Sequence, residues 1–255
     1  MAINEMRLGF TVTAILLSLF AGSPAFGGTD SVRENNLPIP TLAPLVRRIL
    51  PSVVAIRAMK SPPGGPITID PSGGFPDAPL PARKNMVGSG IIVSSDGLVV
   101  TCNHVIEGAD TVTATLSDGR NFDANVLAVD KDADLAVLRI AATGLAAVTI
   151  DDADDLQPGD FVVTLGNALG LGQSVSFGVV SALHRSYGEI RQADLIEIDA
   201  SLRPGNSGGP LVDLRGDLIG VNMARSDETG SERGFGFAVP VSRLRSILLN
   251  LQKSG

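Results

Sequence analysis

Short apolar runs separated by turn signals fill the sequence from residue 88 onward, and this pattern restricts the fold more than any other feature. The stretch SGIIVSSDGLVVTC has one apolar run on each side of Asp96-Gly97, and the next such pair of runs surrounds Asp118-Gly119. Asp-Gly between two apolar runs is a strong signal for a tight β-hairpin. The 29 glycines of the chain supply many further turn positions. The chain is therefore predicted to consist mainly of antiparallel strands.

The strand pattern divides into two halves. About six apolar runs precede a connecting stretch after Gly144, and about six follow it. Apolar residues at helical spacing occur in TLAPLVRRIL before Pro51 and in VSRLRSILLNLQ near the C-terminus. Because closing an antiparallel sheet removes its exposed edges, we predict two β-barrels, over about 83–145 and 155–240, between an N-terminal and a C-terminal helix. The fold class is thus all-β, and the alternative architecture is a single large β-sandwich.

The N-terminal segment is predicted to be a signal peptide, residues 1–25. Arg7 precedes an apolar stretch over residues 8–20, and Ser23-Pro24-Ala25 resembles the small-x-small pattern before a signal peptidase site. The apolar stretch is short for a membrane span. We therefore expect cleavage after Ala25, a periplasmic or secreted mature protein and no stable membrane span; the alternative is a membrane anchor through residues 8–20. Residues 26–40 are predicted to be a linker.

Composition excludes some classes of partner and of stabilising device. The formal net charge is −7, so no basic face is evident for binding the phosphates of a nucleic acid. Cys102 is the single cysteine, which rules out an intrachain disulfide, and we expect it to be a small buried residue at a strand end. The acidic run DDADD at 151–155 lacks the spacing of a calcium loop, and GNALGLG lacks the Lys-Ser/Thr of a phosphate loop. We expect no metal and no cofactor.

Two residue types needed for nucleophilic catalysis flank the strands of the first predicted barrel. His104 follows an apolar strand in VVTCNHVIEG, whereas the other histidine, His184, lies in SALHRSYGE, which we interpret as a polar loop. Asp134 directly precedes LAVL, a strand that should be buried. A carboxylate at the edge of a core needs a hydrogen-bond donor, and a histidine N–H is a good one. Asp130 and Asp132 are nearby alternatives.

The run LRPGNSGGPLV at 202–212 contains the candidate nucleophile, Ser207. Its glycines permit unusual backbone angles, and an acyl-transfer serine needs its own N–H and that of Gly205 to point at one spot. A glycine-rich hairpin without catalytic function is the other interpretation of this run alone. The chain order His104, Asp134, Ser207 is, however, that of the catalytic triad on a chymotrypsin-like double β-barrel. The first two residues would come from the first barrel, and the serine from the second.

The sequence also closely resembles the HtrA/Deg family of serine proteases. The resemblance extends over about 41–250 and implies a trypsin-like serine protease domain at 41–255. It is carried by GSGIIVSSDGLVVTCNHVIEGAD, DKDADLAVLRI, TLGNALGLGQSVSFGVVSAL, IDASLRPGNSGGPLVDLRGDLIGVNMA and GFGFAVP, with LAPLVRRILPSVVAIRA similar to the family's N-terminal lead-in. Family members act on unfolded or misfolded exported polypeptides and favour small aliphatic residues before the cut.

The resemblance implies a role for each candidate residue. His104 is expected to be the general base, Asp134 to orient its imidazole, and Ser207 to form the acyl-enzyme. The backbone N–H groups of Gly205 and Ser207 are expected to form the oxyanion hole. The loops at 166–174 and 222–234 match those that shape the family's substrate pocket. The residues expected to bind substrate are Leu202, Arg203, Asn222, Met223 and Ala224.

The sequence departs from the family pattern in several places. Family members usually carry one or two PDZ domains after the protease, and we expect none in residues 41–255. Cys102 in TCNHV replaces an Asn, and Arg203 and Ala168 replace an Asn and a Pro. Resting family enzymes are typically trimers joined by aromatic contacts near the N-terminus, but residues 29–60 contain no Phe, Tyr or Trp. The resemblance thus implies a homotrimer, although the aromatic residues that usually join it are missing from residues 29–60. The alternative function is a non-proteolytic or latent chaperone or binding module on the same fold.

Overall fold

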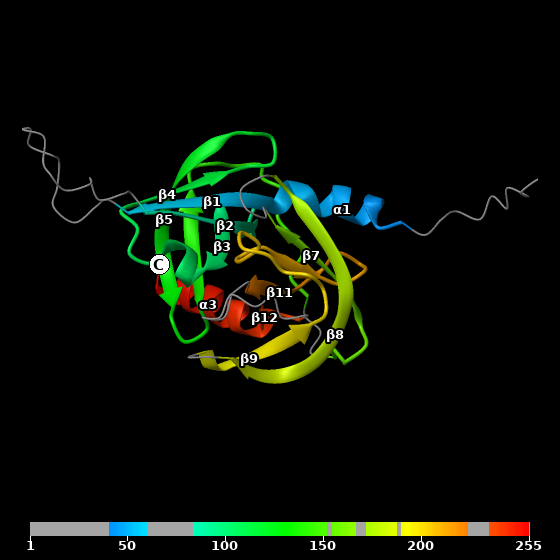
Figure 1. Cartoon of the computed structure of the whole chain (residues 1–255). Coiled ribbons are helices and arrows are strands. Elements are labelled where there is room, and N and C mark those ends of the chain that lie inside the picture. Colours follow the sequence, from blue (N-terminus) through cyan, green and yellow to red (C-terminus); the bar gives the residue numbers. More distant parts are fainter. Residues whose placement is uncertain are drawn as a thin grey trace, which may run out of the picture. The chain divides into compact units, whose positions relative to one another are not determined.

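The computed structural model describes residues 41–60, 84–151, 155–166, 172–187, 190–223 and 235–254. These residues form two closed β-barrels of six antiparallel strands each, with a short helix before the first barrel and a longer one after the second (Figure 1). This arrangement confirms the predicted all-β double barrel with a helix near each end, and it excludes the single sandwich. The predicted signal peptide, the linker and the Pro/Gly-rich stretch at 61–83 lie outside the described residues.

Barrel 1 is closed in the order β1-β2-β3-β6-β5-β4. Its strands are β1 (Val53–Lys60), β2 (Lys84–Ile92), β3 (Leu98–Cys102), β4 (Thr111–Thr115), β5 (Asn121–Asp130) and β6 (Leu135–Ile140). The two predicted hairpins are present, and their turns contain Gly97 and Gly119 at φ of 103° and 89°. Such left-handed angles favour glycine, which explains why Asp-Gly marks both turns.

Barrel 1 begins earlier than the predicted range of 83–145. β1 pairs with β2 on one side and with β4 on the other, so it is the strand that closes the barrel. Its side chains alternate, and Val54, Ile56 and Ala58 are buried in the core. The Pro/Gly-rich stretch that separates β1 from β2 in sequence hid this pairing, because β1 and β2 are not joined by a short turn.

Barrel 2 is closed in the order β10-β11-β12-β9-β8-β7. Its strands are β7 (Phe161–Gly166), β8 (Ser174–Tyr187), β9 (Ile190–Ile198), β10 (Pro210–Val212), β11 (Leu218–Met223) and β12 (Gly236–Pro240). β8 and β9 pair with three register shifts. His184 lies within β8, so its prediction as a loop residue was wrong. The register shift next to it interrupts the regular alternation of side chains by which a strand is predicted from sequence.

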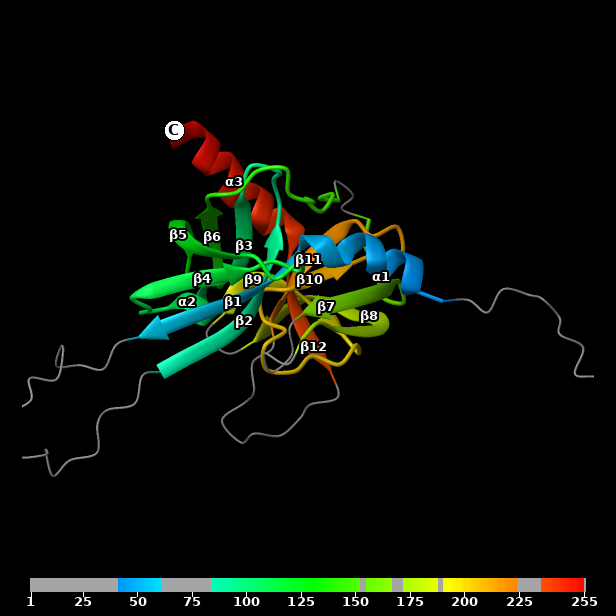
Figure 2. The ribbon, with the colours of Figure 1, turned by 90° about the horizontal axis from the view of Figure 1, so that it is seen from above.

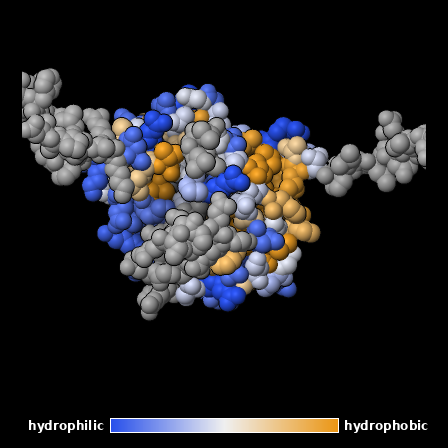
Figure 3. All heavy atoms as spheres, viewed as in Figure 1, coloured by the Kyte–Doolittle hydropathy of each residue, from blue (hydrophilic) through white to orange (hydrophobic). Residues whose placement is uncertain are grey.

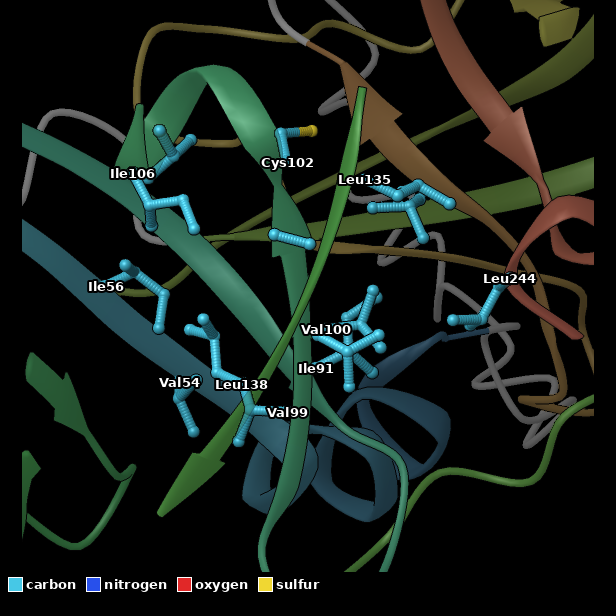
Figure 4. Close-up of a cluster of buried hydrophobic side chains, with 14 of the residues drawn as sticks. Val54, Ile56, Ile91, Val99, Val100, Cys102, Ile106, Leu135, Leu138 and Leu244 are labelled. Carbon is cyan, nitrogen blue, oxygen red and sulfur yellow. The ribbon is translucent and has the colours of Figure 1, made fainter. Parts of the chain in front are cut away.

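The largest hydrophobic cluster belongs mainly to barrel 1 and continues into barrel 2 and the last helix. Figure 4 shows its barrel 1 side chains, such as Ile56, Ile91 and Leu138, pointing into one space, with Leu244 approaching from α3. Helix α3 (Val241–Ser254) packs against this cluster with one apolar face, as its sequence spacing predicted. The side chains on this face are Leu244, Ile247, Leu248 and Leu251. Fixing α3 against both barrels ties them to one another.

Helix α1 (Ala43–Ile49) covers one face of barrel 2. A proline occupies its first turn, where the missing N–H costs no hydrogen bond, and a 3₁₀ turn (Leu50–Ser52) leads from it into β1. Ile49 and neighbouring apolar side chains of α1 pack on Val163 and Leu165 of β7. Figure 2 shows α1 beside β7 and α3 running along the side of barrel 1 near β5. Helix α1 therefore packs on barrel 2, whereas α3 contacts both barrels.

Candidate active site

The end of β3 brings His104 next to Asp134. β3 pairs with β6, and this ladder ends with Cys102 opposite Leu135. His104 lies in the short helix α2 (Asn103–Ile106) that follows β3, and Asp134 immediately precedes β6. The backbone N–H of Asn103 donates to the Asp134 carbonyl at 2.9 Å and extends the pairing past the ladder. Strand register therefore fixes the two residues side by side.

The Asp134 carboxylate is used entirely by His104. One oxygen, Oδ2, lies 2.5 Å from His104 Nδ1, and the other, Oδ1, accepts the His104 backbone N–H at 2.9 Å. Asp134 is only 3% exposed, and its φ is 55°, a left-handed angle that aspartate tolerates better than most residues. A carboxylate at Nδ1 favours the tautomer with its proton on that nitrogen, so Nε2 keeps the lone pair that a general base needs.

The other aspartates and the other histidine occupy different environments. Asp130 accepts the backbone N–H of Ala133, and Asp132 is exposed. His184 Nδ1 lies 2.8 Å from a carboxylate oxygen of Asp194, across β8 and β9, but the His184 side chain is 78% exposed. A surface pair of this kind is screened by water. Of the three aspartates considered from the sequence, Asp134 is the one that holds His104.

The loop between β9 and β10 carries Ser207 and contains a tight turn. The Asn206 N–H donates to the Arg203 carbonyl at 2.9 Å, and Gly205 in the third turn position has a φ of 96°. Pro204 followed by a glycine at positive φ is the pattern of a type II turn. Ser207 itself is buried. The glycine at 205 is thus required by backbone conformation.

Two further glycines allow the loop to lie against both barrels. Gly208 has a φ of 85°, and a Cβ there would overlap the carbonyl oxygen of Ser89 and lie 3.0 Å from the Cys102 nitrogen. A Cβ at Gly209 would overlap the carbonyl oxygen of Leu165 in β7. The backbone on the C-terminal side of Ser207 therefore touches the end of β3, the strand that leads to His104. Only glycine permits so close an approach.

The residues expected to bind substrate lie in three different settings. Leu202 lies beside β12, because a Cβ at Gly236 would be 2.7 Å from Leu202 Cδ1, and Arg203 is exposed. Asn222 is buried and donates from Nδ2 to the carbonyls of Leu165 and Pro210, which makes its side chain a brace inside barrel 2. Met223 belongs to the main hydrophobic cluster. Ala224 lies outside the described residues, as do 167–171 and 224–234 of the two predicted pocket loops.

Cys102 offers a potential third ligand beside His104 and Asp134. A ligand atom from each of the three residues lies within 4.8 Å of the others. However, His104 and Asp134 are in direct contact at 2.5 Å, whereas two ligands on one tetrahedral zinc are separated by roughly 3.3 Å. The buried Cys102 thiol donates to the Asn222 carbonyl. This geometry fits a hydrogen-bonded histidine–carboxylate pair better than a metal site.

Known proteins resemble this chain in both sequence and structure. A family model described as "Trypsin-like peptidase domain" matches residues 88–221. The putative serine protease HhoB of Synechocystis sp. is 40% identical in an alignment of 227 positions that covers 84% of this chain and 53% of that protein. The periplasmic pH-dependent serine endoprotease DegQ of Escherichia coli is 37% identical in an alignment of 243 positions that covers 92% of this chain and 53% of that protein. The chain thus spans about half the length of these curated relatives.

Solved structures of HtrA-type proteases also match this chain. The HtrA-type protease AlgW with a decapeptide matches with a TM-score of 0.71 and 35% identity, over 84% of this chain and 68% of that chain. Within the described parts of residues 41–254 there is no PDZ domain. The double barrel, the hydrogen-bonded histidine–aspartate pair and the glycine-lined serine loop are thus accompanied by matches over most of the sequence. The chain belongs to the trypsin-like peptidase family and, within it, to the HtrA/Deg serine proteases.

Proposed function

We propose that the chain is a serine endopeptidase in which Ser207 is the nucleophile, His104 the general base and Asp134 the residue that orients it. The observation that carries this proposal is the pairing of the partly buried His104 with the buried Asp134 through both carboxylate oxygens. It stands at the end of the strand against which the Ser207 loop is packed. Such a pair holds an imidazole in one tautomer and one orientation, which is the requirement for activating a serine hydroxyl.

The proposed reaction proceeds through an acyl-enzyme. His104 Nε2 takes the Ser207 hydroxyl proton as Oγ attacks the carbonyl carbon of the substrate. The backbone N–H groups of Gly205 and Ser207 stabilise the oxyanion of the tetrahedral intermediate. The Asp134 carboxylate stabilises the imidazolium, which then donates its proton to the departing amine. A water molecule, activated by His104 in the same way, releases the acyl group and restores Ser207.

The proposed substrates are unfolded or misfolded exported polypeptides. Relatives in this family are named periplasmic endoproteases, including DegQ and a DegP-like protein of Brucella suis, and AlgW structures contain a tripeptide or a decapeptide. The predicted signal peptide at 1–25 agrees with a periplasmic location. No helix among the described residues combines the length and apolar character required to cross a membrane.

A homotrimer is the assembly we propose. Phe161 and Phe177 stack at 5.3 Å between ring centroids, yet they are 53% and 49% exposed, and Val175 beside them is exposed as well. These three residues form the β7–β8 patch. Phe161 lies on the face of β7 from which Val163 and Leu165 pack under α1, so the patch continues that apolar surface. In Figure 3, hydrophobic residues gather on the side where α1 and β8 lie in Figure 1.

Light scattering on the full chain and on the double variant Phe161→Ser/Phe177→Ser tests the assembly. The wild type should have three times the chain mass, and the double variant should be a monomer. Leu249→Ser, which changes an equally exposed apolar residue on α3, should remain a trimer. A monomeric wild type would contradict the homotrimer without affecting the proposed chemistry.

The proposed activity is tested with reduced, unfolded casein and a fluorophosphonate probe. The wild type should degrade casein and be labelled at Ser207, because the probe reacts where a base and an oxyanion hole are assembled. Ser207→Ala should lose both properties, whereas Ser95→Ala, a change at an exposed turn serine of barrel 1, should keep both. If the wild type neither cleaves casein nor takes the label, the latent or non-proteolytic binding module is the better description.

A further inference from the structure

Ser89, on β2 of barrel 1, makes two hydrogen bonds to the Ser207 loop of barrel 2. Its backbone N–H donates to the Ser207 carbonyl at 2.8 Å, and its hydroxyl donates to the Gly205 carbonyl at 2.6 Å. The Ser89 side chain is fully buried at 0% exposure. The two acceptors belong to the two residues whose N–H groups are proposed to bind the oxyanion.

Together with two bonds within barrel 2, these hydrogen bonds fix the orientation of two peptide units of the Ser207 loop. A peptide unit is planar, so holding its carbonyl and its N–H determines its orientation. The Gly205–Asn206 unit is held by the Ser89 hydroxyl at its carbonyl and by the Arg203 carbonyl at its N–H. The Ser207–Gly208 unit is held by the Ser89 N–H and, at 2.8 Å, by the Asn222 carbonyl. The unit that carries the Ser207 N–H lies between these two fixed units.

Ser89 also links the loop to the strand that carries the proposed base. The Ser89 carbonyl accepts a hydrogen bond from the Thr101 hydroxyl at 2.7 Å. Thr101 lies on β3, three residues before His104. A continuous path of hydrogen bonds therefore runs from the strand of the base, through Ser89, to both sides of the nucleophile. Because the base and the nucleophile come from different barrels, their separation depends on contacts of this kind.

The space around the hydroxyl is shaped to receive it. A Cβ at Gly166 would lie 3.0 Å from Ser89 Oγ and 2.9 Å from the Asn206 Cα. A Cβ at Gly88 would lie 3.1 Å from the Ser207 carbonyl oxygen. The glycines at 88 and 166 thus allow β2 and β7 to approach the loop closely enough for the Ser89 bonds to form.

We propose that Ser89 is a positioning residue, whose hydroxyl sets the Ser207 loop in register with His104 across the two barrels. This inference rests on the proposed serine-protease function. Removing the hydroxyl leaves the Gly205 carbonyl without this donor and frees one side of the loop. Because a displacement of about 1 Å can lower a rate about 100-fold, Ser89→Ala should lower kcat by about 10- to 100-fold while KM changes little.

The matched control is Ser52→Ala. Ser52 is also a buried serine, and its hydroxyl donates to the Ile49 carbonyl at 2.7 Å, near the end of α1. Both substitutions remove one buried hydroxyl–carbonyl hydrogen bond, so they should lower the Tm by similar amounts. Only Ser89→Ala should change kcat.

The experiment measures kcat and KM on a peptide substrate with valine before the cut, using the full chain. It adds the inhibition constant of a valine-containing peptide boronic acid, whose tetrahedral adduct on a serine places an oxygen in the oxyanion hole. In Ser89→Ala the boronate should bind more weakly by the same factor by which kcat/KM falls. A defect that is only structural would instead lower the fraction of active protein and leave the boronate affinity of the remaining active fraction unchanged.

Each outcome separates the inference from the function on which it rests. An active wild type with a Ser89→Ala variant of equal kcat and equal boronate affinity would overturn the inference alone. A wild type without activity or labelling would overturn the proposed function and this inference with it. If Ser89→Ala cannot be purified, Ser89→Cys keeps a side chain of similar shape but a much weaker donor. A fully active Ser89→Cys would then overturn the inference.

Discussion

The two barrels have the same number of strands and the same closed arrangement, yet they contribute to the candidate site in different ways. Barrel 1 contributes two side chains, His104 and Asp134, whose positions follow from the β3–β6 ladder. Barrel 2 contributes a stretch of backbone around Ser207, between β9 and β10, that lies outside any ladder. The barrel 1 half of the site therefore depends on which residues stand at the strand ends. The barrel 2 half depends on the backbone conformation of the Ser207 loop.

The two halves of the candidate site should therefore respond differently to substitution. A ladder with many hydrogen bonds survives the loss of one side chain, so a change at Asp134 should remove chemistry and leave the fold. The Ser207 loop is held by a few bonds and by glycines that allow close approach. A change there should affect the conformation and the chemistry together. The substitutions below test this contrast, from the largest expected effect to the smallest.

Asp134→Asn should have the largest effect on turnover. An amide at this position no longer selects the Nδ1–H tautomer of His104, and by analogy with the triad template kcat should fall about 10⁴-fold. The Tm should change far less than the activity. Asp132→Asn alters an exposed neighbour and should leave kcat as in the wild type. If Asp132→Asn and Asp134→Asn were equally impaired, the assignment of the orienting acid would be wrong.

Gly208→Ala should disturb the fold and the site at once. The left-handed φ costs about 1–2 kcal/mol for a residue with a Cβ, and the overlap with the Ser89 carbonyl adds about 1–3 kcal/mol. The free energy of unfolding, measured with denaturant, and the rate of fluorophosphonate labelling should both be well below the wild-type values.

The control for this change is Gly119→Ala in the second hairpin of barrel 1. Its φ is 89°, but a Cβ there has no neighbour within 4 Å. It should therefore show only the backbone cost of about 1–2 kcal/mol and normal labelling. Equal losses in the two variants would mean that close packing of the loop is unimportant.

Cys102→Ala should have an intermediate effect on stability and none on chemistry. The thiol is buried at the end of β3, and its removal leaves a small cavity that costs about 1–2 kcal/mol. The labelling rate should stay at the wild-type value. A large loss of labelling in a folded Cys102→Ala variant would show that barrel 1 contributes a third functional side chain to the site.

Asp96→Asn, in the first hairpin of barrel 1, should have the smallest effect. The Ser94 hydroxyl and then Arg139 lower the pKa of the Asp96 carboxyl below its usual value of 3.8. A depressed pKa stabilises the fold above the unfolded pKa, and this contribution is lost as the pH falls through the folded one. The Tm of Asp96→Asn should thus be slightly below the wild type at pH 7, with the difference disappearing in acid. A difference that grew as the pH fell below 3.8 would contradict this account.

Much of the fold could be predicted because local signals and global structure agree. Asp96-Gly97 and Asp118-Gly119 specify their hairpins through the left-handed angle that glycine adopts. The role of β1 was missed because its partners, β2 and β4, are separated from it by many residues, and no local signal encodes that closure. His184 was misplaced for a related reason, since a register shift interrupts the alternation of its strand.

The sequence by itself determined the strand-rich class and the position of the hairpins, and it predicted the three residues that we propose for catalysis. These depend on residue type and on spacing along the chain. The tertiary structure decided which residues stand around them. It turned Asn222 into a brace of barrel 2, placed Met223 in the core, and brought Ser89 against the loop of Ser207. The physical reason is that close packing between distant segments leaves no periodicity in the sequence, whereas turns and strand ends do.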